Sequence, residues 1–416
     1  MEFIALPTGR GVLFLLLASA ACAVAVINAG LLTALTAACF SALVISSFLM
    51  TLFSFSGIAL ERKFLHRGVC GDPVPLEITV RNRLPFFRQS FTVTERYDFS
   101  VSGKCVMAVP ALAPYGKMIL NYSVKAEKRG EFMLDKVYLR SGDPFGLFRK
   151  TKLFSLPEYL EIQPEIFPLE SLYGADVNGG VPDPEGRNQG VSGRGTEFFG
   201  VRPYRMGDEV RHIHWKSTAS QGRLMVKEFE AAAVDQIVIL LDTCRKSVSP
   251  EPLENNFEFL VSCAASLAHF LEDKYCHLRF IAADDRGGLH HISGDIASVK
   301  NRVRQVLTLI RESGEEFVSV LPSAVENIPP RSRVFLLTMS TAAVPEYIRI
   351  LEEQDCSCLW LYAPAELFPP AEPDKPRKIR RERVMKKLQK LDIIPLVADF
   401  TSGAEILEGE SADGKS

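Results

Sequence analysis

The sequence predicts three successive structures: a membrane helical hairpin, an antiparallel β-sandwich and a doubly wound α/β domain. Three observations predict them: a long uncharged apolar stretch near the N-terminus, segments with a two-residue apolar period, and an alternation of apolar strands with amphipathic helices. The chain has 416 residues, enough for two or three domains. Its formal net charge of -2 argues against a general nucleic-acid-binding protein, which would carry a basic excess.

The uncharged stretch lies between Arg10 and Glu61. One crossing of a membrane needs about 20 apolar residues. The short turn "NAG" divides the stretch, which predicts two transmembrane helices over about residues 11–27 and 31–55 within an N-terminal segment 1–63. The alternative is a cleaved signal peptide, because "ASAACA" contains small residues, but a second apolar segment follows at once.

Basic residues flank this hairpin on both sides, and the turn carries no charge. The positive-inside rule therefore predicts that both ends and all the following domains are cytoplasmic. The inverted, envelope-side orientation is the alternative. The nine cysteines, without CxxC pairs, suit reduced thiols. The basic residues concerned are Arg10, Arg62, Lys63 and Arg67.

Residues 64–170 are predicted to form the sandwich. "VPLEITVRN", "KMILNYSVKAE" and "EFMLDKVYLR" alternate apolar and polar residues, and turn residues separate these runs. A stretch rich in glycine and proline, 171–196, is predicted to be a linker.

Residues 197–406 alternate strand and helix, and 407–416 are predicted to be a disordered tail. "DQIVILLD" suits a central parallel strand, and an apolar-periodic helix follows it. The segments "CHLRFIAAD", "RVFLLTMS", "CSCLWLYAP" and "DIIPLVAD" are predicted as further strands, so ligands would bind at the carboxyl ends of the strands. The basic run 375–390 could contact anionic lipid, but it is better explained as the solvated face of the last helix.

An aspartate, Asp242, closes the first strand of this domain. The von Willebrand factor A-type fold holds a divalent cation at this place through D-x-S-x-S, because Mg²⁺ prefers hard oxygen ligands. This chain has Cys244 and Lys246 at the two hydroxyl positions, a soft thiol and a competing cation. We therefore expect the fold without a working cation site.

The stretch "RPYRMGDEVRHIHWKSTA", residues 202–219, concentrates charge around one tryptophan. His212 and His214 could share one face of a strand and bind a metal, but no third His or Cys stands at a metal-ligand spacing. We expect a structural arm clamped by salt bridges, with Trp215 filling an apolar gap. The alternative is a partner-docking or anion-binding surface. The candidate residues are Arg202, Tyr204, Asp208, Arg211, His214, Trp215 and Lys216.

Enzyme motifs are absent from the sequence: there is no Walker A loop, HExxH, G-x-S-x-G or GxGxxG after a strand. No catalytic residue and no cofactor is therefore predicted. The rival hypothesis is a metal-dependent hydrolase that uses Asp242, His212 and His214.

The segment "GRGTEFFGVRPYRMGDEVRHIHWKSTASQGRLMVKEFE", residues 193–230, resembles the signature of the bacterial family catalogued as domain of unknown function 58. "KRGEFML" and "DPFGLF" resemble that family's upstream region. The resemblance implies a protein anchored in the inner membrane of a bacterial cell, with a von Willebrand A-like domain. Such proteins are associated with MoxR-type AAA+ ATPases and often with transglutaminase-like membrane proteins. We therefore expect a non-enzymatic scaffold or adaptor that is fixed in the lipid bilayer and binds a protein partner.

Overall fold

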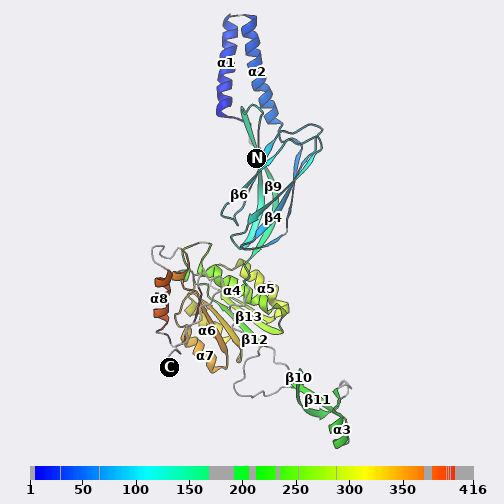
Figure 1. Ribbon diagram of the computed structural model, residues 1–416, viewed down its shortest axis with the longest axis vertical. Coiled ribbons are helices and arrows are strands. Elements are labelled where there is room, and N and C mark those ends of the chain that lie inside the picture. Colours follow the sequence, from blue (N-terminus) through cyan, green and yellow to red (C-terminus); the bar gives the residue numbers. More distant parts are fainter. Residues whose placement is uncertain are drawn as a thin grey trace. The chain divides into compact units, whose positions relative to one another are not determined.

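A computed structural model describes residues 5–28, 30–64, 66–167, 192–205, 212–230, 235–251, 253–286, 288–369, 377–389, 391, 393 and 395–398 (Figure 1). The chain divides into two compact units, Met1–Glu165 with Arg304–Ile310, and Ile166–Val303 with Arg311–Ser416. The expected linker up to residue 191 and the expected tail 407–416 lie outside the described residues. Strand β10 (Ser192–Pro203) begins within the last residues of the expected linker.

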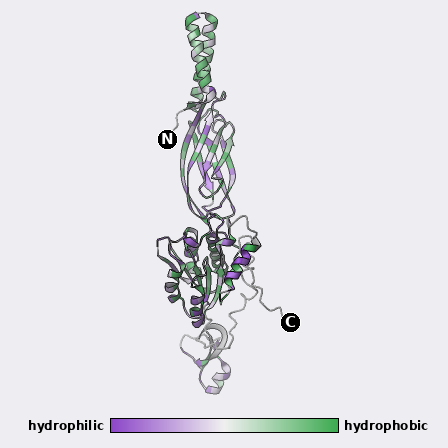
Figure 2. Ribbon diagram, turned by 90° about the vertical axis from the view of Figure 1, so that its left-hand side faces the viewer, coloured by the Kyte–Doolittle hydropathy of each residue, from purple (hydrophilic) through white to green (hydrophobic). Residues whose placement is uncertain are grey.

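Two apolar helices, α1 (Gly9–Asn28) and α2 (Leu31–Leu52), open the chain. Both are long and apolar enough to cross a membrane, and most of their side chains are exposed. Figure 2 shows them as a pair of hydrophobic helices lying side by side. The second helix ends three residues before the predicted residue 55, because the chain turns there into the first strand of a sheet.

Two β-sheets follow the helices. One sheet has the order β1-β9-β8-β5-β6, with β3 beside β9, and the other has the order β2-β4-β7. The pairing is antiparallel except between β3 and β9, which run parallel, a departure from the all-antiparallel expectation. The strands are β1 (Leu6–Pro7), β2 (Ile58–Phe64), β3 (Arg67–Val69), β4 (Pro73–Asn82), β5 (Phe91–Arg96), β6 (Lys104–Val109), β7 (Lys117–Lys125), β8 (Gly130–Gly142) and β9 (Phe148–Gln163).

Both sheets contribute to shared apolar cores. Ile78 and Val80 of β4 pack in one cluster with Val93 of β5 and Leu139 of β8. These residues come from alternate positions of their strands, as the two-residue period predicts. Strand β2 begins at Ile58, so the β-rich unit starts before the predicted residue 64.

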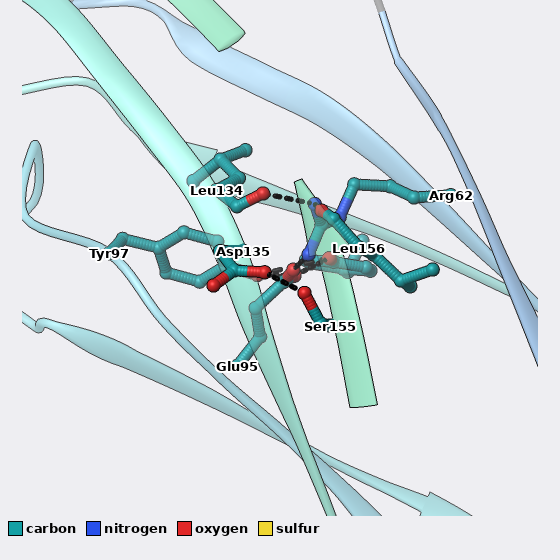
Figure 3. A network of polar contacts seen from close by, with 8 residues as sticks. Arg62, Glu95, Tyr97, Leu134, Asp135, Ser155 and Leu156 are labelled. Atoms are coloured by element: carbon teal, nitrogen blue, oxygen red, sulfur yellow. Dashed lines mark hydrogen bonds and ion pairs between the residues drawn. The ribbon is translucent and has the colours of Figure 1, made fainter. Parts of the chain in front are cut away.

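A buried charge pair joins the two sheets inside this unit (Figure 3). The guanidinium of Arg62, on β2, donates hydrogen bonds to the carboxylate of Glu95 on β5 and to the carbonyl oxygens of Leu134 and Leu156 at 2.9 and 2.8 Å. Arg62 is one of the basic residues from which the membrane orientation is predicted. Its side chain is fully buried, so it is not a surface charge beside the membrane.

Two tyrosines complete the network around Glu95. The hydroxyls of Tyr97 and Tyr122 both donate to Glu95 Oε2. Burial, followed by the charge of Glu95, raises the pKa of both phenols above their ordinary value. The carboxylate of Glu95 thus has both oxygens occupied by donors in a site closed to water.

The second unit contains a six-stranded sheet of order β14-β13-β12-β15-β16-β17. Neighbouring strands are parallel except for β14, which is antiparallel to β13 at one edge. The strands are β12 (Asp235–Leu241), β13 (Cys276–Ala283), β14 (Leu289–Asp295), β15 (Arg333–Thr338), β16 (Ser357–Tyr362) and β17 (Leu396–Val397). The edge strand β14 was not predicted, because "LHHISGD" lacks a clear apolar period.

Helices cover both faces of this sheet (Figure 1). Val238 and Leu240 of β12 pack in a cluster with side chains of α6 and α7, whereas α4 packs against β12 and β15 without joining that cluster. The helices are α4 (Asn256–Phe270), α5 (Ile296–Leu309), α6 (Phe317–Glu326), α7 (Val344–Glu353) and α8 (Arg377–Leu388), with single 3-10 turns η4 (Arg245–Ser247), η5 (Leu271–Asp273) and η6 (Ala365–Leu367). Helix α8 contains much of the basic run, and its apolar side chains Val384 and Leu388 are buried, as expected for a helix with one solvated face.

Candidate functional site

The carboxyl end of β12 is the place where a doubly wound sheet normally binds its ligand. Asp242 follows directly after this strand, and its backbone N–H donates to the Leu337 carbonyl of β15 at 2.8 Å. Its side chain is fully buried. Oδ1 accepts from the Cys244 N–H and Oδ2 from the Met339 N–H, each at 2.9 Å. The carboxylate therefore ties the ends of two neighbouring strands together.

Burial raises the pKa of Asp242 to about 6, while hydrogen bonds from the backbone N–H groups of Cys244, Met339 and Ser340 lower it. Three backbone donors thus converge on one carboxyl group. A cation at this position would have to displace donors that the chain itself provides.

A loop of the chain also crosses this edge of the sheet. Ser313 N–H donates to the Thr243 carbonyl at 2.7 Å, and the Arg245 N–H donates to the Ser313 carbonyl at 2.9 Å. Thr243 Oγ1 donates in turn to the Ala283 carbonyl at 3.1 Å. The polar groups of Thr243 beside Asp242 therefore already have hydrogen-bond partners in the backbone of the chain.

The two other positions of the altered cation motif are Cys244 and Lys246. Cys244 is buried, and Lys246 Nζ forms an exposed ion pair with Glu316 Oε1 at 2.7 Å. Across the described part of the chain, no three His, Cys, Asp or Glu side chains gather as they would around a metal ion.

The charged stretch around Trp215 belongs to a separate arm, which is described here by itself. β10 pairs with β11 (Met225–Glu230) as an antiparallel ribbon, and α3 (Trp215–Gln221) lies between them in sequence. Ile213 forms a bridge to Val226, and the Tyr204 N–H donates to the Leu224 carbonyl at 2.9 Å. The arm is thus a strand–helix–strand motif.

His214 is the N-terminal cap of α3. The ring Nδ1 of His214 accepts from the Ser217 N–H at 3.2 Å and lies 2.8 Å from Ser217 Oγ. The backbone N–H of His214 donates to the Met225 carbonyl at 2.8 Å. These contacts occupy one ring nitrogen in a structural role. The alternative in which His212 and His214 share one face of a strand is not the arrangement seen, because neither residue lies in a strand and His214 caps α3.

Trp215 does not fill an apolar gap. Its side chain is 66% exposed at the first position of α3, and the neighbouring Lys216 is exposed as well. The Arg202 guanidinium donates to the Pro203 carbonyl at 3.1 Å, and Tyr204 is half-buried. Asp208 and Arg211 lie outside the described residues, so the expected salt-bridge clamp stays a prediction.

Three features at the sheet edge were missed by sequence reasoning: the role of Thr243, the crossing loop at Ser313, and the Trp360 indole N–H that donates to Thr338 Oγ1 at 2.8 Å. The signal available was the pair Met339 and Ser340 at the end of β15, where a cation-binding domain would have an acid. Their backbone N–H groups are what Asp242 binds.

Residues 200–306, which include most of this arm and the strands β12, β13 and β14, match the model of the family described as protein of unknown function DUF58. The similarity to DUF58 is therefore shown for this segment. The uncharacterized protein YeaD of Bacillus subtilis (strain 168) is 27% identical over 222 residues, half of this chain. The chain spans about half of the length of that relative, 51%.

Solved structures resemble the chain only weakly. A β-glucosidase from Listeria innocua in complex with glucose gives a TM-score of 0.19 at 12% identity, covering 25% of this chain and 16% of that chain. A GH20 exo-β-N-acetylglucosaminidase from Vibrio harveyi in complex with N-acetylglucosamine gives 0.18 at 9% identity, covering 74% of this chain and 57% of that chain. At such TM-scores neither likeness indicates a shared fold or activity.

Proposed function

We propose that this DUF58 chain is a non-enzymatic scaffold or adaptor, anchored in the bacterial inner membrane by α1 and α2. Its α/β domain, of the von Willebrand A-like type, binds a protein partner on the cytoplasmic side. The partner that the family resemblance favours is a MoxR-type AAA+ ATPase. Support for the domain type comes from the strand order β14-β13-β12-β15-β16-β17 with its antiparallel edge, and from the aspartate that ends β12.

The hydrogen bonding of the buried Asp242 carboxylate is the main observation in support of this proposal. Its two carboxylate oxygens accept backbone hydrogen bonds inside the protein, and the loop at Ser313 covers the adjoining backbone. The position that would hold a cation or a reacting group is thus used to join β12 to β15. A domain built in this way favours recognition through its surface over chemistry in a cleft.

The arm supplies a surface suited to such recognition. Tryptophan is one of the residue types that most often anchor a protein interface, and the Trp215 side chain is 66% exposed. Because Trp215 stands at the first position of a capped helix, its backbone is fixed before a partner binds. Less ordering entropy would then be lost on binding.

Replacing Trp215 with alanine should weaken recovery of the ATPase strongly, by about 2 kcal/mol or roughly thirtyfold in affinity if Trp215 is an interface anchor. The stability of the chain should change by no more than about 0.5 kcal/mol, because the side chain is exposed. The measurement is affinity purification of the full chain from detergent-solubilised native membranes, with and without ATP, followed by immunodetection of the ATPase.

The matched control is Tyr275→Ala, which removes another exposed aromatic side chain of the second unit. This variant should recover as much ATPase as the unsubstituted chain. Recovery of no ATPase by the unsubstituted chain in either nucleotide state would refute the proposed partner, and equal losses in both variants would refute the role of Trp215.

A further inference from the structure

The ends of the two apolar helices are attached directly to the β-sheets, with no intervening stalk. At the start of α1 the Thr8 N–H donates to the Leu147 carbonyl at 2.8 Å, and Thr8 Oγ1 donates to the Gly146 carbonyl at 2.6 Å. At the end of α2 the Lys150 ammonium donates to the Leu52 carbonyl at 2.8 Å. Both helix ends therefore meet the same end of the β-rich unit (Figure 1).

This attachment is close. A Cβ atom built on Gly11 of α1 would lie 2.0 Å from the Leu147 carbonyl oxygen, so only glycine permits the contact. The Phe48 ring of α2 packs edge-on against Phe148 of β9 with centroids 5.4 Å apart. The hairpin and the sheets are thus held in a fixed geometry at this joint.

Three loops surround the joint, and we name them the collar loops: residues 83–90 between β4 and β5, 110–116 between β6 and β7, and 143–147 between β8 and β9. The Arg88 guanidinium donates to the Phe53 carbonyl just after α2, at 2.9 Å. The Tyr115 N–H donates to the Leu84 carbonyl at 3.2 Å, which joins the first loop to the second. Gly146, in the third loop, is the residue that Thr8 contacts.

The collar loops expose aromatic side chains. An aromatic ring is less stable in contact with water than when it is buried. A group of exposed rings on neighbouring loops therefore indicates that a membrane or a partner covers them. Trp and Tyr gather where a membrane protein meets the headgroup layer, and interfacial segments bury Trp, Phe and Leu side chains at the boundary between headgroups and acyl chains. The exposed rings are Phe86 at 66%, Phe87 at 74%, Tyr115 at 67% and Phe145 at 53%.

The charge at this end has one sign. The residues 5–10, 81–90, 110–119 and 141–150 contain a single acid, Asp143. It is buried, and its carboxylate accepts from the N–H groups of Phe145 and Phe148 at 3.0 and 2.6 Å. Exposed basic side chains in the same stretches are Arg10, Arg81, Arg83, Lys117 and Arg149.

The lengths of α1 and α2 determine the depth in the bilayer at which the attached end of the β-rich unit lies. α1 has 20 residues and α2 has 22, which at about 1.5 Å per residue gives about 30 and 33 Å. The hydrocarbon core of a bilayer is about 30 Å thick, and the headgroup layers add roughly 5–8 Å on each side. Helices that cross this core therefore end at its boundary, and loops hydrogen-bonded to those ends lie within the headgroup layer.

We propose that the collar loops are a membrane-interface surface that inserts into the phospholipid headgroup layer of the bilayer crossed by α1 and α2. The aromatic rings lie at the level of the glycerol backbone, and the basic side chains contact lipid phosphates. The proposal rests on the membrane anchor in the proposed function. Its consequence is that the β-rich unit stands at a fixed angle on the membrane surface.

The opposite end of the same sheets differs in composition. Tyr159 of β9 is as exposed as the collar rings, but it lies beside Glu131, Glu158 and Glu161 around an open pocket. It stands eleven residues along β9 from Phe148, which is roughly 36 Å at about 3.3 Å per residue. An exposed aromatic ring far from the membrane is thus available in the same fold as a control.

The test uses the full chain reconstituted in vesicles of phosphatidylcholine and phosphatidylglycerol whose acyl chains are brominated near the headgroup. Bromine quenches tryptophan fluorescence at short range. Tryptophan is introduced by Phe86→Trp or Phe145→Trp, with Tyr159→Trp as the distant control and Leu49→Trp, on the exposed face of α2, as the control inside the bilayer. The signal of the two native tryptophans is measured on the unsubstituted chain and subtracted.

We expect the added fluorescence at positions 86 and 145 to be largely quenched, that at position 159 to be unaffected, and that at position 49 to be quenched. If positions 86 and 145 behave like position 159 while position 49 is quenched, the membrane anchor stands and the collar is refuted. If position 49 is also unquenched, the anchor itself is refuted, and the collar with it.

Charge reversal tests the basic side chains separately. In the Phe86→Trp chain, Arg83→Glu together with Lys117→Glu should reduce the quenching, and should do so more as the phosphatidylglycerol content rises. Lys104→Glu, an exposed lysine at the start of β6, at the other end of that strand from the collar, is the matched control and should leave quenching unchanged. Equal quenching in all these chains would contradict contact with lipid phosphates.

Discussion

Replacement of Asp242 with alanine should destabilise the α/β domain by at least about 3 kcal/mol, because three buried N–H groups lose their acceptor at about 1–3 kcal/mol each. Those groups belong to Cys244, Met339 and Ser340. Urea unfolding of the full chain in detergent, followed by tryptophan fluorescence, measures this loss. A Trp215→Phe background leaves Trp360 as the one reporter, since the chain has two tryptophans and Trp360 is buried in this domain.

The control is Asp284→Ala. The Asp284 carboxylate also accepts backbone hydrogen bonds, from the Arg286 and Gly288 N–H groups, but in an exposed turn where water can replace it. Its removal should cost no more than about 1 kcal/mol. A loss at Asp242 as small as that at Asp284 would show that the carboxylate does not hold β12 and β15 together.

Asp242→Asn should change the dependence of stability on pH. The pKa of Asp242 is about 6 in the folded chain, against an ordinary value of 3.8, so between these two values the folded state keeps a proton that the unfolded state has lost. This contribution to stability is fully present below pH 3.8 and is lost as the pH rises through about 6. Unfolding titrations across this window should therefore show a flatter profile for Asp242→Asn than for the unsubstituted chain. A parallel pair of profiles would contradict the raised pKa.

Replacement of Arg62 with methionine should destabilise the β-rich unit by about 3–5 kcal/mol, because it leaves the buried carboxylate of Glu95 without its cation. Glu95→Gln should also destabilise it, since the guanidinium of Arg62 would then be buried beside a neutral amide. Hydrogen–deuterium exchange of peptides from β2, β4 and β5, in the full chain, reports the free energy of opening of this unit alone.

The double variant Arg62→Met with Glu95→Gln decides whether the two residues act as a pair. Its cost should be smaller than the sum of the two single costs, by about 0.5–3 kcal/mol for residues in direct contact. Arg96→Met is a matched control, since this neighbouring arginine is exposed on β5. Additive costs of the two single substitutions would show that the ion pair contributes nothing to the joining of the sheets.

The strands and helices with a strong apolar period were predictable from the sequence. "DQIVILLD" is the central strand β12, and α1 and α2 occupy the charge-free stretch almost as predicted. Short or irregular segments were not found: β1 has two residues, and α6 contains Pro322, which interrupts the helical pattern. Local periodicity determines only elements that are long enough to show it.

The environments of single residues were less predictable, because they depend on segments distant in the sequence. Asp242 accepts a hydrogen bond from the backbone N–H of Met339, ninety-seven residues later, so its structural role cannot be predicted from the residues around the motif. Arg62 lies two residues after the last position of the uncharged stretch and was therefore predicted to flank the membrane, yet the alternation along β2 turns it into the core. The collar loops are separate in sequence and meet only because the strands fold.

The proposed function requires that the chain is anchored in the membrane and binds a protein partner through its exposed arm. The most direct measurement is photocrosslinking in native membranes from a benzophenone amino acid placed at position 215, with position 275 as the matched exposed site. We expect a crosslink from position 215 to a MoxR-type ATPase, and none from position 275. Crosslinks from position 215 that stay within the chain itself would contradict it.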